Sequence, residues 1–189
     1  MVPKVENPSA LAELSDALSP GTALVALVET ALGVHRAYEL AGARGVTRLA
    51  FGSIDFAFDI GAEEANSALL FARSALVVAS RAARVAAPLD GGTVNLDDRS
   101  VVAADAATAA SLGFGGNLCI HPHQVGAINA AFAPTEEDVD RAHRVLDSVT
   151  DGGAGRLDGQ MVDRAVTERA RLILRRARLG AAPDDARRE

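Results

Sequence analysis

The stretch Ala23-Leu-Val-Ala-Leu-Val-Glu29 is an apolar run of strand length that ends in a carboxylate. An uninterrupted run of this kind is typical of a strand buried on both faces, as in parallel sheets. A second run, Leu49-Ala-Phe51, is followed by Gly-Ser-Ile and then by Asp55. The two stretches predict two neighbouring strands, each with an acidic residue just beyond its carboxyl end.

The rest of the chain alternates short apolar runs with longer alanine-rich stretches. We expect a short helix that ends at Leu18 and longer helices over about 33–43, 65–83 and 99–112. Between them we expect about five parallel strands, at residues 1–5, 23–28, 49–51, 85–89 and 118–120. This alternation predicts right-handed βαβ units and therefore an α/β fold with a parallel sheet. Five strands are too few for a closed eight-stranded barrel. An open doubly wound sheet and part of a barrel remain the two alternatives at this point.

The pattern changes after residue 133, where helical periodicity continues without strand-like runs. Thr135 precedes two glutamates and is expected to cap a helix that runs to Ser148. A final long helix is expected over about 161–179. We therefore divide the chain into a strand-and-helix domain (1–133), a helical extension (134–180) and a flexible tail (181–189).

Composition limits the classes of protein to which the chain can belong. It has 189 residues, 49% of them apolar, with 25 acidic and 19 basic side chains. Such a chain can bury a core, and its acidic balance argues against a nucleic-acid surface. The one cysteine, Cys119, excludes an intrachain disulfide. There is no apolar run long enough to span a membrane and no signal-peptide pattern, so we expect a cytoplasmic protein.

Glu29 and Asp55 are the first candidates for chemistry, because each follows a predicted strand and one strand–helix unit separates them. The carboxyl ends of adjacent parallel strands meet at one edge of the sheet. Two carboxylates there, with no clustered cysteine or histidine, suit a hard divalent cation such as Mg²⁺. The alternative is structural: Asp55 would cap the next helix, and Glu29 would pair with an arginine such as Arg36.

Lys4, His121 and Pro122 are the candidate substrate-binding residues. Lys4 is the only lysine in the chain and ends the first predicted strand. An electrostatic or structural role for it is favoured over a Schiff base. His121 and Pro122 follow the last predicted strand. The histidine is either a base or ligand, or a residue that closes a turn through hydrogen bonds.

Eight segments spread along the chain form a recognisable set. They are Val-Pro-Lys-Val-Glu (2–6), Ala-Leu-Val-Glu-Thr-Ala-x-Gly (26–33), Phe-Gly-Ser-Ile-Asp-Phe (51–56), Phe-Ala-Arg-Ser-Ala-Leu-Val (71–77), Leu-Gly-Phe-Gly-Gly-Asn (112–117), Ile-His-Pro-x-Gln-Val (120–125), Ile-Asn-x-Ala-Phe-x-Pro (128–134) and Asp-Gly-Gln-Met-Val-Asp (158–163). Taken together, they resemble the HpcH/HpaI aldolase and citrate lyase beta-subunit superfamily, and the resemblance covers residues 2 to about 179. The segments near the C-terminus resemble its CoA-ester lyase branch, which acts on citryl-CoA, malyl-CoA or citramalyl-CoA.

The resemblance implies a TIM (β/α)₈-barrel fold with Mg²⁺ held by Glu29 and Asp55. The ion would bind the oxygens of a keto acid and stabilise an enolate during carbon–carbon cleavage of a CoA thioester. Asp163 matches the acid/base carboxylate of a C-terminal lid that reaches a neighbouring subunit, in a homo-oligomer that is a trimer by resemblance. Taken alone, Asp163 is also an ordinary acidic residue of a first helical turn.

The sequence also departs from the family pattern. It begins at the position of the family's fourth strand, so the resemblance implies a partial barrel plus the C-terminal helical lid segment. Ile54 stands where the family usually has an acidic residue. Two further functions therefore stay open. One is an aldolase of the same superfamily that acts on a free 2-keto acid, and the other is a non-catalytic remnant or partner subunit.

Overall fold

The computed structural model describes residues 1–149 and 155–180. They divide into two compact units, Met1–Phe132 and a second unit that begins at Ala133. The predicted flexible tail at 181–189 lies outside the described residues. Among those that are described, no helix has both the length and the hydrophobicity needed to cross a membrane.

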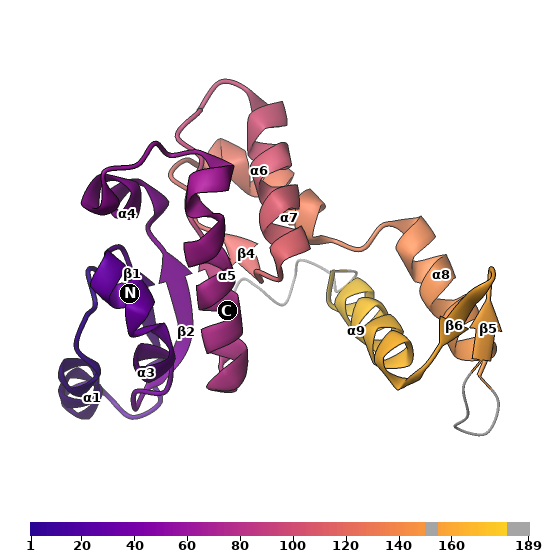
Figure 1. The fold of residues 1–189 in the computed structure, drawn as a ribbon, viewed down its shortest axis with the longest axis horizontal. Coiled ribbons are helices and arrows are strands. Elements are labelled where there is room, and N and C mark those ends of the chain that lie inside the picture. Colours follow the sequence, from indigo (N-terminus) through magenta and orange to yellow (C-terminus); the bar gives the residue numbers. More distant parts are fainter. Residues whose placement is uncertain (150–154, 181–189) are drawn as a thin grey trace. The chain divides into compact units, whose positions relative to one another are not determined.

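The first unit is built on a parallel sheet of four strands (Figure 1). Its strands lie in the order β1-β2-β3-β4, and each pairs in parallel with the next. Doubly wound sheets reverse their strand order at a switch point, whereas barrel strands follow one another in sequence. The strands are β1 (Leu24–Val28), β2 (Val46–Phe51), β3 (Ala86–Asp90) and β4 (Gly116–Asn117).

The N-terminal segment lies beside the free edge of β1, where Val2 forms an isolated parallel bridge to Ala26. The predicted first strand is therefore present as a single bridge and adds no fifth strand to the sheet. The prediction of a strand at 118–120 is wrong, because β4 lies at Gly116–Asn117. The backbone pairs at Gly116 and Asn117, and the Leu118 N–H donates to the Asp90 carbonyl at 2.9 Å.

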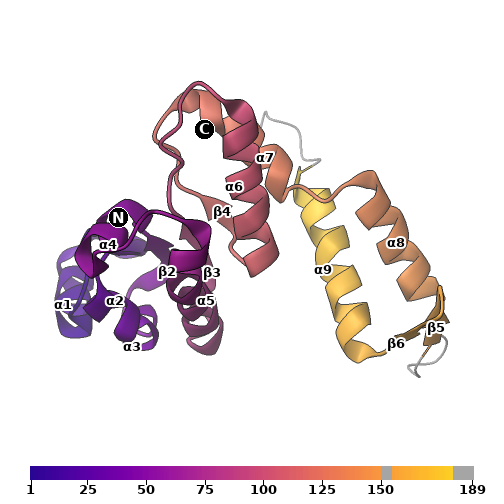
Figure 2. The same ribbon diagram turned by 45° about the horizontal axis from the view of Figure 1, so that its top comes forward.

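Helices follow each strand, and several of them pack against the sheet. α3 and α5 pack against β2, α5 also packs against β3, and α6 and α7 lie side by side (Figure 2). The predicted helix at 33–43 is divided in two at Arg36, and α4 and α7 were not predicted from the sequence. The helices are α1 (Pro8–Ala17), α2 (Ala31–His35), α3 (Ala37–Ala41), α4 (Ser53–Ile60), α5 (Asn66–Ala82), α6 (Arg99–Leu112), η1 (Pro122–Gln124, a 3₁₀ turn) and α7 (Val125–Phe132).

The core of the first unit lies between the sheet and these helices. β2 contributes Leu49 and Phe51, and α5 contributes Leu69 and Leu76, all of them fully buried. These side chains alternate along the strand and recur with helical spacing along α5, so each element presents one apolar face to the other.

The second unit is a helical hairpin with a short β-hairpin at its turn. α8 (Glu136–Asp147) begins with a capping box in which Thr135 and Asp138 exchange hydrogen bonds. β5 (Gly155–Leu157) and β6 (Gln160–Val162) pair in antiparallel fashion, and α9 (Arg164–Gly180) follows. The final helix was predicted to begin near Met161, but that residue belongs to β6.

The buried face of α5 gives a test of the core. Replacing Leu76 by Ala removes a fully buried side chain and is expected to lower the free energy of unfolding by about 2–5 kcal/mol. Val78 lies on the same helix but is 67% exposed, so Val78→Ala is the matched control with an expected change below about 0.5 kcal/mol. Urea unfolding measures both, and equal losses would contradict the assigned face.

Candidate metal centre

Four polar residues mark the carboxyl edge of the sheet. Glu29 follows β1, Asp55 lies in the first turn of α4 after β2, Asp90 ends β3 and Asn117 ends β4. Parallel strands bring their carboxyl ends to the same edge, which is where α/β proteins bind ligands.

Glu29 is held against the sheet, with only 8% of its surface exposed. Its Oε2 accepts a hydrogen bond from the main-chain N–H of Lys4 at 2.8 Å. Gly52 lies directly beside it, since a Cβ at that position would overlap Glu29 Cγ. A glycine at 52 therefore leaves the space that the glutamate side chain occupies. The bond to Lys4 takes the place of the predicted alternative, a pair with Arg36, because Arg36 donates to the Glu6 carbonyl instead.

Asp55 projects from the first turn of α4 and its side chain is 48% exposed. Its Oδ1 lies 3.1 Å from Lys4 Nζ. The N-cap of α4 is Gly52, and no side chain caps that end of the helix. Asp55 therefore does not have the capping role that was its structural alternative.

Lys4 joins the two carboxylates, because its main-chain N–H binds Glu29 and its ammonium group binds Asp55. The hydrogen bond and charge of Asp55 raise the pKa of Lys4 above its usual value, and the charges of Glu29 and Asp59 act in the same direction. Lys4 also has a positive φ of 48°. Such strain in a residue other than glycine is often found at functional sites.

The two carboxylates fit a magnesium ion by their chemistry. Mg²⁺ prefers oxygen ligands and is usually bound through one or two carboxylates, with waters and substrate oxygens completing the shell. Glu29 and Asp55 offer that donor set. Throughout residues 1–149 and 155–180, no group of three or more acidic, histidine or cysteine side chains is arranged to hold a metal. A site here would therefore depend on solvent or substrate for its other ligands.

A buried ion pair at the end of β3 was missed from the sequence. Arg73 Nε of α5 lies 2.9 Å from Asp90 Oδ2, and these side chains are 11% and 3% exposed. Asp90 Oδ1 also accepts the N–H of Gly91 at 2.9 Å. Burial raises the pKa of Asp90, although Arg73 and Gly91 act in the opposite direction. The sequence does contain a signal for Asp90, because this residue follows a predicted strand just as Glu29 and Asp55 do.

A polar cavity of about 380 Å³ opens beside this pair. Ser53 donates to Glu64 across it at 2.8 Å, and Thr93 donates to Asp105 at the same distance. The side chains around it come from the helices α4, α5 and α6, from the loop after β3, and from Asp90 and Asn117 at the ends of β3 and β4. Because these two residues end their strands, the cavity lies at the carboxyl edge of the sheet, as Glu29 and Asp55 do. Its lining includes Ser53, Glu64, Asn66, Arg73, Asp90, Gly91, Thr93, Asn95, Asp105 and Asn117.

His121 and Pro122 lie in the loop after β4. His121 is the N-cap of the 3₁₀ turn that Pro122 begins, and its Nδ1 accepts the N–H of His123 at 3.2 Å. The turn-closing alternative therefore describes what His121 does here. The neighbouring Gln124 is the buried residue of the loop and donates to the Thr93 carbonyl at 2.7 Å. It connects the loop after β4 to the loop after β3, a role that was not predicted from the sequence.

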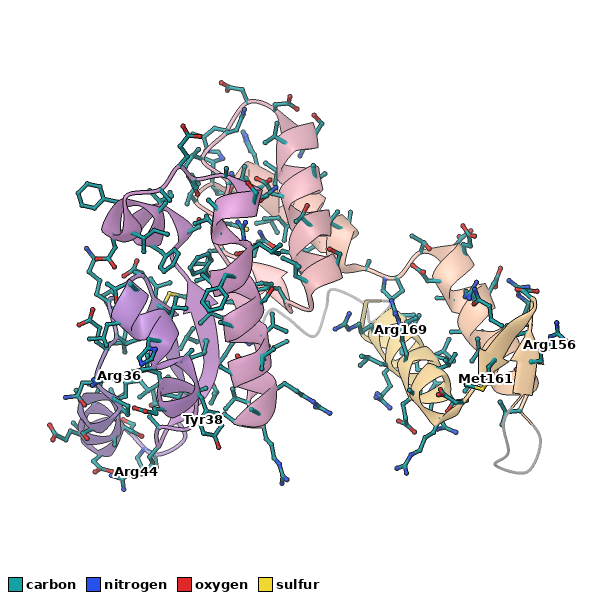
Figure 3. The ribbon with its side chains drawn as sticks, in the orientation of Figure 1. Arg36, Tyr38, Arg44, Arg156, Met161 and Arg169 are labelled. Atoms are coloured by element: carbon teal, nitrogen blue, oxygen red, sulfur yellow. The ribbon has the colours of Figure 1, made fainter. Side chains whose placement is uncertain are left out.

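Asp163 belongs to the second unit, where it precedes α9. Its Oδ1 accepts the N–H of Val166 at 3.0 Å and its carbonyl accepts the N–H of Thr167. Asp163 thus caps the helix. Asp158 lies at the turn of the β-hairpin and pairs with Arg144 at 3.3 Å. Figure 3 shows the side chains of Met161 on β6 and Arg169 on α9, which both line a cavity of about 360 Å³ within this unit.

A parallel α/β unit with acidic residues gathered at the carboxyl edge of its sheet is the arrangement of an α/β enzyme with a strand-end site. The profile of the HpcH/HpaI aldolase/citrate lyase family matches residues 1–122. The chain belongs to this family.

Individual relatives agree with this assignment. The chain is 35% identical over 184 residues to a citrate lyase subunit beta-like protein of Deinococcus radiodurans, covering 92% of this chain and 64% of that protein. It is 34% identical over 175 residues to citrate lyase subunit beta of Escherichia coli K12, covering 88% and 58%. The chain thus spans roughly three fifths of the curated relatives it matches.

A solved structure of a relative has a similar fold. The protein CitE of Mycobacterium tuberculosis, crystallised with magnesium, acetoacetate and coenzyme A, superimposes with a TM-score of 0.82 at 32% identity. That comparison covers 94% of this chain and 67% of CitE.

The buried ion pair of Arg73 and Asp90 gives a second testable prediction. Arg73→Met would leave Asp90 buried without its partner and is expected to cost about 3–5 kcal/mol of unfolding free energy at neutral pH. Protonation of Asp90 in this variant removes the uncompensated charge. The loss should therefore be small at and below the ordinary aspartate pKa of 3.8, grow as the pH rises from there to the higher folded-state pKa of the buried Asp90, and level off above it.

Arg171 offers the matched control, because it forms an exposed pair with Glu168 in which both side chains are about half exposed. Arg171→Met should cost less than about 1 kcal/mol, with little dependence on pH. Chemical unfolding between pH 4 and 8 measures both variants. A cost for Arg73→Met that does not change with pH would contradict the role given to Asp90.

Proposed function

We propose that the chain supplies the metal centre and lid of a Mg²⁺-dependent carbon–carbon lyase that acts on a CoA thioester of a hydroxy acid. One observation carries this proposal: Glu29 and Asp55, from the ends of adjacent strands, both bind the same residue, Lys4. The relatives support the chemical class. They include citrate lyase beta subunits and, at 28% identity over 188 residues, the (3S)-malyl-CoA thioesterase of Cereibacter sphaeroides.

Glu29 and Asp55 are the residues that would hold the ion. When bound, Mg²⁺ supplies Lewis-acid stabilisation of negative charge on substrate oxygens. Glu29 is fixed by the Lys4 N–H and by the space beside Gly52, so its carboxylate is oriented before any ligand arrives. The support for magnesium is the donor set, together with the magnesium in the CitE complexes with acetoacetate and coenzyme A and with pyruvate.

The sheet β1–β4 is proposed to form consecutive strands of a TIM barrel. The parallel pairing in sequential order supports this, as does the likeness to CitE. In such a barrel, the residues that follow each strand face a common mouth. The substrate-binding roles proposed for Lys4, His121 and Pro122 agree with that placement, since all three lie in segments that follow or flank strand ends.

Asp163 is proposed to be the acid/base residue that moves a proton at the acyl-CoA carbon. It would act from the second unit, placed over the barrel mouth of a neighbouring subunit in a homo-oligomer, a trimer by resemblance. A carboxylate can combine this role with helix capping, because Oδ1 accepts the Val166 N–H and Oδ2 is the second oxygen of the same group.

The metal centre is tested by titrating Mg²⁺ into the chain in a calorimeter. Asp55→Asn and Glu29→Gln each remove one charged ligand and are expected to weaken binding at least tenfold, since Mg²⁺ binds through few carboxylates. Glu13→Gln, on the exposed face of α1, is the control and should bind as the wild type does. Unchanged binding in both site variants would remove the proposal.

Asp163 is tested by cleavage of malyl-CoA and citramalyl-CoA to free acyl-CoA. Asp163→Asn keeps a helix-capping side chain but cannot move the proton, so turnover should fall about 10²- to 10⁴-fold with Mg²⁺ affinity unchanged. Asp158→Asn is the control and should leave turnover intact. A chain that binds no metal, cleaves neither thioester and is retained by a full-length relative would instead be a non-catalytic partner subunit. Cleavage of a free 2-keto acid alone would indicate the aldolase.

A further inference from the structure

The ammonium group of Lys4 lies where a cation bound by Asp55 would be expected. Its Nζ is 3.1 Å from Asp55 Oδ1, while the N–H of the same residue donates to Glu29 Oε2 at 2.8 Å. We propose that Lys4 is an internal counter-ion that occupies the Mg²⁺ site of the metal-free chain, so that the ion binds only by displacing the ammonium group from Asp55. This inference rests on the proposed metal centre at Glu29 and Asp55.

The main chain fixes the position from which Lys4 acts. Val2 exchanges two hydrogen bonds of 2.9 Å with β1, and Val5 donates to the Leu27 carbonyl at 3.3 Å. Lys4 lies between these anchors with its φ of 48°. That conformation aims its N–H at Glu29 while its side chain reaches Asp55. The anchors hold a strained conformation that places one residue against both carboxylates.

The charges around Lys4 explain why a cation is needed there. Asp55, Glu29 and Asp59 all act electrostatically on its ammonium group. All three are carboxylates, so their like charges disfavour this arrangement unless a positive charge lies among them. Lys4 is the only lysine of the chain, so its flexible stem and compact charge occur at this place alone. Its side chain is 65% exposed, which leaves it free to move into solvent when a stronger cation arrives.

If the Lys4 side chain is removed, a counter-ion role and a purely structural role predict opposite effects on Mg²⁺ binding. If Lys4 only supports the loop, removing its side chain should disorder Asp55 and weaken Mg²⁺ binding. If its ammonium group competes with the ion, removing the charge should strengthen binding. The main-chain bond to Glu29 does not depend on the side chain, so a substitution at position 4 separates the two contacts.

The test compares Mg²⁺ binding by the wild type, Lys4→Met and Lys4→Arg. Methionine keeps an unbranched stem without charge, and arginine keeps the charge. Lys4→Met is expected to bind Mg²⁺ roughly fivefold or more tightly than the wild type, because one like charge near the ion is gone. Lys4→Arg should stay near the wild type. Without metal, Lys4→Met should melt at a lower temperature than the wild type, and saturating Mg²⁺ should remove that difference.

A second readout uses the fact that the chain has one lysine. Untagged protein labelled with ¹³C,¹⁵N-lysine gives one lysine side-chain signal, which needs no assignment. Addition of Mg²⁺ should shift this signal as the ammonium group leaves Asp55. The same addition should have no effect on the signal in Glu29→Gln, whose metal site is damaged while its Asp55 is intact.

The possible outcomes distinguish a failure of the counter-ion role of Lys4 from a failure of the proposed metal centre. Equal or weaker Mg²⁺ binding by Lys4→Met, with a lysine signal that does not move in the wild type, would overturn the counter-ion and leave the metal centre standing. Absence of Mg²⁺ binding in the wild type and in Lys4→Met would overturn both. Binding by Lys4→Met alone would support the counter-ion most strongly, since the ammonium group would then exclude the ion altogether.

Discussion

The consecutive parallel pairing of β1, β2, β3 and β4 is the constraint on which the site depends. Parallel strands end at one edge, so the residue that follows each strand arrives beside those that follow its neighbours. Glu29 and Asp55 are far from one another in the chain only because a whole strand–helix unit lies between them. The folded sheet brings the two residues to the same edge, where Lys4 contacts both carboxylates.

The loops at this edge are fixed by buried polar bonds, which makes the edge suitable for a binding site. The pair of Arg73 and Asp90 ties α5 to the end of β3, and Gln124 ties the loop after β4 to the Thr93 carbonyl. Such groups are costly to bury without partners, so the loops that contain them have few alternative conformations. These bonds fix the loops after β3 and β4, and at the end of β1 the N–H of Lys4 holds the buried Glu29. The side chains of Asp55 and Lys4 are more exposed, at 48% and 65%, and have more freedom to move.

The sequence predicted the parallel α/β fold, the positions of β1 and most of the long helices, and Glu29 and Asp55 at adjacent strand ends. These features depend on local patterns, such as uninterrupted apolar runs and the residues just after them. It did not predict α4, α7 or the β-hairpin, and it misplaced β4, which is too short to have a pattern of its own. Lys4 was noticed as the only lysine. Its contact with both carboxylates follows from the bridge between Val2 and Ala26, a long-range pairing that no local pattern reveals. Asp90 follows a predicted strand and could have been noticed there, but its ion pair with Arg73 of α5 is again a long-range contact that forms only in the folded unit.

The most direct test of the metal centre is a crystal of the chain soaked in Mn²⁺, an ion that uses the same oxygen ligands as Mg²⁺ and scatters anomalously. The account predicts one strong anomalous peak within about 2.3 Å of carboxylate oxygens of both Glu29 and Asp55, with Lys4 Nζ moved away from Asp55. A peak bound elsewhere, or none while Lys4 keeps its contact with Asp55 at high Mn²⁺ concentration, would contradict it.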